Sequence, residues 1–233
     1  MTASRILAIQ RRHAPMFRIR LGKQEDGVPT RLVNEIRVTS PNKAVVEAFT
    51  EVHGGRPMRW VRSKTKTEYQ AFLPITRLPI MLLPGEPLQQ TMELWAGQTC
   101  QRRCDSVTMT GGAPCECGPD KPIEDRECKP TSRLTVACPD VPIVGVGMLV
   151  TGSVIAAGEL AGTLALAEPL LRQNQSVRAT LRIDQMVTPG HKFAVPRIEL
   201  EDITFEDIAL AASSLPALGP ATRLEPLALQ GGE

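Results

Sequence analysis

The sequence has few of the residues and motifs on which enzymes depend. It contains only three histidines, His13, His53 and His191, and none of them has the spacing of a catalytic or metal-binding set. It also has no nucleophile elbow, no phosphate-binding loop and no dinucleotide fingerprint. We therefore expect that the chain is not an enzyme.

Long apolar runs and a strong charge of either sign are missing as well. No uninterrupted apolar run approaches the roughly 18 residues that span a bilayer, and Met1–Arg5 is not followed by a signal-peptide core. We therefore expect a soluble, cytoplasmic protein. The formal net charge is only +2, from 27 basic and 25 acidic residues, which argues against a protein that binds nucleic acid with its whole surface.

The residues that are present predict an α+β domain. Phe17–Leu21 alternates apolar and basic residues as a strand does, and Ser40-Pro41 is a helix start, with Ser40 as the N-cap, for a helix that ends at Gly54. A second helix is expected over 153–167, kinked or restarted at Pro169. Further strands are expected over 35–38, 58–62, 68–73, 78–83, 91–95, 133–137, 177–186 and 192–200, the last two joined by a turn at Pro189-Gly190.

This order of elements favours an α+β fold, with a mainly antiparallel sheet and two main helices, over an alternating α/β fold. We predict a single domain over residues 1–210. A cysteine-rich, loop-like insertion without apolar periodicity interrupts it at 97–130. Residues 211–233 are rich in Ala, Pro and Gly, and we expect them to be a disordered tail.

Five of the six cysteines fall within this insertion: Cys100, Cys104, Cys115, Cys117 and Cys128. Close cysteine pairs brought together across a loop are what a tetrahedral thiolate site needs, so we predict a structural zinc ion. Four ligands suffice, so one of the five cysteines is spare or acts as an alternate ligand. Free or disulfide-bonded thiols and an iron–sulfur cluster are the alternatives. Cys138 lies outside the group, and we expect it to be a small buried hydrophobe.

Several blocks of sequence, in one order, resemble the recombination directionality factors of actinophage large serine integrases, of the Streptomyces-phage type. They span about residues 9–200. The matching blocks are Gln10-Arg11-Arg12-His13, Arg18-Ile19-Arg20-Leu21-Gly22, Arg37-Val38-Thr39-Ser40-Pro41, Glu93-Leu94-Trp95-Ala96-Gly97, Cys100-Gln101-Arg102-Arg103-Cys104-Asp105, Cys115-Glu116-Cys117, Cys128-Lys129-Pro130-Thr131-Ser132-Arg133-Leu134, Glu159-Leu160-Ala161-Gly162 and Lys192-Phe193-Ala194-Val195-Pro196.

The resemblance implies a regulator that binds a phage-encoded integrase on DNA in the bacterial cytoplasm. Such a factor promotes recombination between the hybrid left and right attachment sites, which excises the prophage, and it inhibits integration. The covalent chemistry then belongs to the integrase, and neither a membrane nor a small-molecule substrate is involved. The alternative is a sequence-nonspecific DNA-binding protein with a structural zinc site, whose candidate basic surface is Arg11, Arg12, Arg18 and Arg20.

Overall fold

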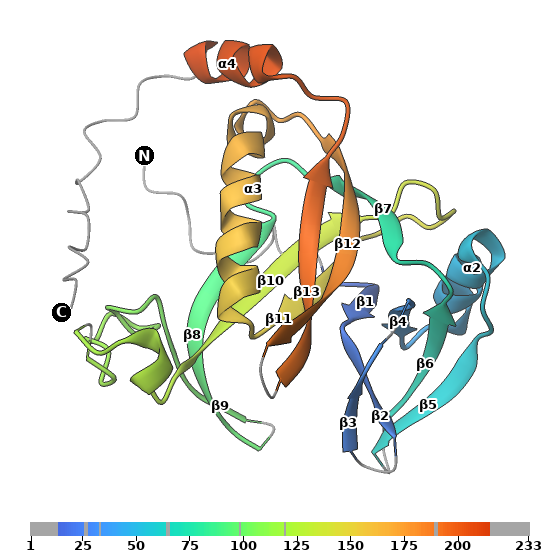
Figure 1. Cartoon of the computed structure of the whole chain (residues 1–233), viewed down its shortest axis with the longest axis horizontal. Helices are drawn as coiled ribbons and strands as arrows, with labels where there is room; N and C mark the ends of the chain where they lie inside the picture. Colours follow the sequence, from blue (N-terminus) through green and yellow to red (C-terminus); the bar gives the residue numbers. More distant parts are fainter. Residues whose placement is uncertain are drawn as a thin grey trace.

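A computed structural model describes residues 14–214 except positions 26–27, 33, 64–65, 98, 119 and 189–190. These residues form one eleven-stranded sheet and a separate two-stranded hairpin of β2 (Gly22–Glu25) and β3 (Val28–Arg31) (Figure 1). The strands of the large sheet are β1 (Phe17–Arg20), β4 (Ile36–Ser40), β5 (Met58–Ser63), β6 (Lys66–Leu73), β7 (Arg77–Leu82), β8 (Leu88–Ala96), β9 (Thr99–Cys104), β10 (Lys129–Ala137), β11 (Gly147–Thr151), β12 (Val177–Thr188) and β13 (His191–Leu200).

The large sheet consists of two antiparallel halves that meet at one parallel pair of strands. Its order is β13-β12-β7-β10-β11-β1-β4-β6-β5, and β8 and β9 extend it beside β10. Among the described strands, only β1 and β11 pair in parallel, through Phe17–Gly147, Arg18–Met148 and Ile19–Leu149. The prediction of a mixed α+β fold with a mainly antiparallel sheet is confirmed.

Each half of the sheet has its own helix. The helix α2 (Lys43–His53) packs on β4 and β6, whereas α3 (Val154–Arg172) lies across β13, β10 and β8 (Figure 1). A third helix, α4 (Phe205–Ser214), packs on α3, and the Gln173 side chain donates a hydrogen bond of 2.9 Å to the carbonyl oxygen of Ala211. The described residues therefore contain three α-helices, one more than the two main helices predicted.

The start of α2 differs from the prediction. Asn42, not Ser40, is the N-cap: its side-chain oxygen accepts the Ala44 N–H at 3.0 Å. The Ser40 hydroxyl instead accepts the Asn42 N–H and donates to the carbonyl oxygen of Met16 at 2.7 Å, so it ties the helix start to the segment before β1. Gly54 ends the helix as predicted, with a φ of 78° that favours glycine.

The helix α3 differs from the predicted kink at Pro169. It continues without a break to Arg172, although Pro169 lies inside it. Proline removes the hydrogen bond to the carbonyl of Ala165, but Ala165 is exposed, so water can bind that oxygen. The helix has 19 residues and is long and apolar enough to cross a membrane, even though Glu159 and Glu168 interrupt its apolar run. One face of α3 is nevertheless buried on the sheet.

Other elements were not predicted. The hairpin of β2 and β3, the strand β11 and the helix α4 had no counterpart in the sequence analysis. The tail was predicted from residue 211, but α4 continues to Ser214. The expectations for residues 215–233 and for the turn at 189–190 concern positions outside the described residues.

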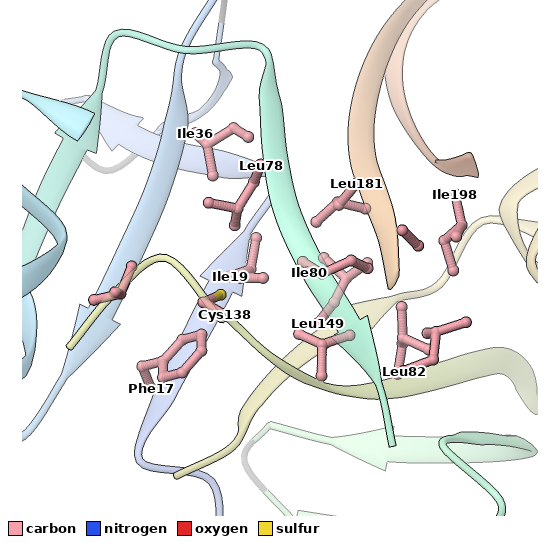
Figure 2. Packing of buried hydrophobic residues seen from close by; sticks show 14 of the residues in the cluster. Phe17, Ile19, Ile36, Leu78, Ile80, Leu82, Cys138, Leu149, Leu181 and Ile198 are labelled. Carbon is pink, nitrogen blue, oxygen red and sulfur yellow. The ribbon is translucent and has the colours of Figure 1, made fainter. Parts of the chain in front are cut away.

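One apolar core runs through both halves of the sheet. Figure 2 shows part of this core, including Phe17 and Ile19 of β1, Leu149 of β11 and Leu181 of β12. Phe17 also meets Phe49 of α2 edge to face, with ring centroids 4.8 Å apart. Cys138 belongs to this core, as predicted, and burial raises the pKa of its thiol to about 12.

The junction of the halves gives a testable prediction. A Cβ added at Gly147 would lie 2.0 Å from the Phe17 ring, which cannot move without disturbing the core. We expect Gly147→Ala to lower the free energy of unfolding by about 1–3 kcal/mol, measured by denaturant titration. In the control Gly162→Ala, the new methyl group on α3 meets nothing within 4 Å, so we expect a gain of about 0.5–1 kcal/mol. Equal effects of the two substitutions would contradict this account.

Candidate functional site

The cysteine-rich stretch folds onto one end of the sheet, beside the β8–β9 hairpin (Figure 1). Its first part is the strand β9, which pairs with β8 from Met92–Cys104 to Ala96–Thr99. Residues 105–128, between β9 and β10, form what we call the cysteine lobe. It includes the 3₁₀ turn η1 (Ile123–Asp125). The stretch is therefore more ordered than the loop-like insertion that was predicted.

Polar contacts hold the backbone of the cysteine lobe. The Asp105 carboxylate accepts two backbone N–H groups of the lobe, at 2.7 and 2.9 Å, which lowers the pKa of Asp105. Arg126 is buried and donates to two lobe carbonyl oxygens, at 2.8 and 3.2 Å. On β9, Arg102 forms ion pairs with Glu116, at 2.7 Å, and with Glu127. The lobe is thus tied both to itself and to the hairpin beneath it.

Four of the five predicted cysteines come together, Cys104 at the end of β9 and three in the lobe. The Sγ atoms of Cys104 and Cys115 are 3.3 Å apart, and those of Cys117 and Cys128 are 3.2 Å apart. All four are buried, and together with Met92 they form a cluster separate from the main core. The backbone N–H of Cys128 donates to the Cys117 sulfur, which is the main reason that the pKa of the Cys117 thiol is lowered.

The fifth cysteine, Cys100, lies outside this cluster because of an irregularity in β9. Pairing shifts register between Leu94 and Trp95, so that Cys100 faces Trp95 whereas Cys104 faces Met92. Directly paired residues share a face of the sheet. Cys104 therefore lies on the Met92 face, toward the cluster, while Cys100 is turned to the Trp95 face, and its thiol donates to the carbonyl oxygen of Arg102.

The sulfur distances correspond neither to a disulfide nor to a formed metal centre. All six cysteines are free thiols, and a disulfide would bring two sulfurs to about 2.05 Å. Within the part of the chain that the structure describes, no three His, Cys, Asp or Glu side chains have the arrangement of a metal site. The four thiols lie in one cluster, but the two sulfurs within each pair are closer together than two ligands of one ion would be.

Behind the cluster, a buried carboxylate joins three strands. Glu93 of β8 accepts hydrogen bonds from Arg103 of β9 at 2.6 Å, from Arg133 of β10 at 2.8 Å and from the Trp95 indole N–H at 2.9 Å. Its side chain is 0% exposed. Burial alone raises the pKa of Glu93, but the bonds from Arg133, Trp95 and Arg103 outweigh it and lower the pKa to about 2. Sequence reasoning missed this site because Glu93 and Arg133 are distant in the chain.

The predicted basic surface is only partly described. Arg11 and Arg12 lie outside the described residues. Arg18 is exposed on β1, whereas Arg20 donates to the Thr39 hydroxyl at 3.1 Å and lies over the Trp60 ring, 5.0 Å from its centroid. One of the two described arginines is thus engaged within the sheet.

A comparison of the sequence with known protein families gives the class of this protein. A family model described as Gp3-like, recombination directionality factor-like, matches residues 18–201. Because the match covers most of the chain, the protein belongs to this family of recombination directionality factor-like proteins. No curated protein and no solved structure matches the chain. The match ends before α4, which begins at Phe205.

The Glu93 site gives a prediction for stability against pH. The folded-state pKa of about 2 lies below the ordinary value of 4.5, so the ionised carboxylate stabilises the fold above about pH 4.5, and this contribution is lost as the pH falls toward 2. We expect Glu93→Gln to lower the free energy of unfolding at pH 7 by roughly 2–4 kcal/mol, because Arg103 and Arg133 lose their shared anion. Urea titrations between pH 7 and pH 3 measure both effects.

The matched control is Glu86→Gln, which removes an exposed carboxylate from the turn before β8. We expect it to change stability by less than about 0.5 kcal/mol. If Glu93→Gln retained the full acid dependence of the wild-type protein, Glu93 would not be the group that titrates.

Proposed function

We propose that this chain is a recombination directionality factor for a large serine integrase of a Streptomyces-type phage. In this proposal it binds the integrase on DNA, promotes recombination between the hybrid left and right attachment sites, and inhibits integration. The observation that supports it most is the family match over residues 18–201. The ordered blocks of similar sequence, including the cysteine pattern, point to the same class. The site of action would be the cytoplasm of the bacterial host.

A binding protein can set the direction of this reaction without performing it. Substrate and product DNA contain the same number of phosphodiester bonds, so direction must come from unequal binding to conformations of the integrase. Moving a two-state balance from 1:99 to 99:1 requires about 5.5 kcal/mol of preference. A single protein interface of ordinary size supplies free energies of this order.

We likewise propose that the chain is not itself an enzyme. Its sequence lacks recognisable catalytic motifs, and the serine chemistry would belong to the integrase. The buried polar site that is present, around Glu93, has its carboxylate oxygens occupied by Arg103, Arg133 and Trp95. This arrangement suits a structural link between strands better than proton transfer to a substrate.

The proposal predicts a reversal of recombination in a purified system. With integrase alone, we expect recombination of the phage and bacterial attachment sites and little recombination of the hybrid sites. Adding this protein should reverse that preference. In gel-shift experiments, it should enlarge the integrase–DNA complex and should not shift DNA by itself. An unchanged direction of recombination with a panel of integrases from such phages would contradict the proposal, as would DNA cleavage by this chain alone.

The DNA-binding alternative makes a separate prediction about Arg18. If the exposed Arg18 contacts phosphates, binding to DNA alone should be measurable. Arg18→Ala should then weaken this binding and lower the slope of log K against log salt concentration by about 1, the value for one lost phosphate contact. Under the regulator proposal, this substitution leaves DNA alone unbound at every salt concentration. Arg56→Ala, at an exposed arginine beyond α2, is the matched control for loss of one positive charge.

A further inference from the structure

We propose that Cys104, Cys115, Cys117 and Cys128 bind one zinc ion, and that Cys100 is not a ligand. The inference concerns how the cysteine lobe is held and does not depend on the proposed role in recombination. It also goes further than the spacing of the cysteines, which leaves open which of the five is spare.

The four sulfurs form one group rather than two separate pairs. Cys115 and Cys117 belong to different close pairs, yet they interact with each other, and Cys104 interacts across the cluster with Cys128. Four buried thiols in one cluster provide the set of soft ligands that zinc prefers in tetrahedral structural sites.

Small movements within each close pair would bring its two sulfurs to the spacing of zinc ligands. With Zn–S bonds of about 2.3 Å, tetrahedral geometry separates the sulfurs by about 3.8 Å. The two observed pairs, at 3.3 and 3.2 Å, would each open by about half an ångström. A small rotation of the cysteine side chains supplies this movement, whereas a disulfide in either pair would require the sulfurs to approach by more than 1 Å.

Two backbone N–H groups point to sulfurs of the cluster. The N–H of Cys128 points to the Cys117 sulfur, and the N–H of Cys117 points to the Cys115 sulfur. Hydrogen bonds of this kind orient metal ligands. On β9, Arg102 adds positive charge near Cys117.

The positions of the ligands explain what the ion would do. Cys104 and Cys128 stand where the lobe leaves β9 and enters β10, and Cys115 and Cys117 lie in its middle. One ion therefore ties the middle of the lobe to both of its ends. Among the described residues, the cysteines and Met92 are buried in this cluster, with Leu94 and Met109 partly buried against it. With so few apolar contacts, the ion would add binding energy to the polar contacts that hold the lobe.

The bulge in β9 excludes Cys100. In a regular strand, Cys100 and Cys104 would lie on the same face, and both could reach the cluster. The register shift beside Trp95 turns Cys100 to the opposite face, away from Met92 and the four thiols. Replacing Cys100 should therefore leave the metal in place, although its spacing in the sequence resembles that of a ligand.

The experiment measures zinc in the full-length protein, purified with a thiol reductant, for the wild type and for single cysteine variants. We expect about one zinc per chain in the wild type. The metal should be lost in Cys117→Ser and Cys128→Ser but retained in Cys100→Ser and Cys138→Ala. Substitution with Co²⁺ should give the strong sulfur-to-cobalt charge-transfer absorption of a tetrathiolate site, and Cys100→Ser should leave that spectrum unchanged.

The cobalt spectrum of the wild-type protein tests the site even if a ligand variant fails to fold. Limited proteolysis before and after removal of the metal by a chelator should show new cleavage within residues 105–128. A metal-free wild-type protein would overturn the proposal, as would bound iron, an intact mass showing two disulfides under reducing purification, or loss of zinc in Cys100→Ser. None of these results would alter the outcome of the recombination assay.

Discussion

The Phe17 ring packed on Gly147 is the tightest constraint at the parallel junction where the two halves of the sheet meet. Only three residue pairs join β1 to β11, and without a side chain at Gly147 the ring fills the space between the strands. The same ring meets Phe49 of α2. One aromatic side chain thus links the parallel junction to the helix α2, which covers the half of the sheet that consists of β1, β4, β6 and β5. The other half, under α3, supports the cysteine lobe.

The lobe is held on the sheet by two sets of contacts, one on each face of the β8–β9 hairpin. Toward the lobe, Met92 and Cys104 form the base of the thiol cluster. On the other face, Glu93 joins β8, β9 and β10 through Arg103 and Arg133. The base of the lobe is therefore fixed by a buried charge network that does not involve the cysteines. Any metal bound by the cluster would be organising the lobe on a platform that is already rigid.

The sequence predicted those features whose signals are local. The helix end at Gly54, the alternation in β1 and the long strands β12 and β13 follow from residue patterns over a few positions. The N-cap of α2 was misassigned because Ser40 and Asn42 have equal propensity, and only the contact with Met16 decides between them. The strand β11 was missed because it is identified by its partners β1 and β10. The clustering of cysteines was visible in the sequence, but the separation of Cys100 was not. It depends on a register shift against Trp95, which no spacing within β9 reveals.

The path of the chain into and out of the lobe has a consequence for how such proteins can diverge. Cys104 and Pro130 both pair with Met92, one on each side of β8, so the lobe begins and ends on strands held a fixed distance apart. Closing a longer loop between fixed ends costs little additional entropy, since the cost grows only with the logarithm of its length. The segments between Cys104 and Cys115, and between Cys117 and Cys128, can therefore lengthen or shorten without changing the register of β8, β9 or β10. Variation in lobe size would then alter the outline of the molecule at this end while the sheet beneath it stays the same.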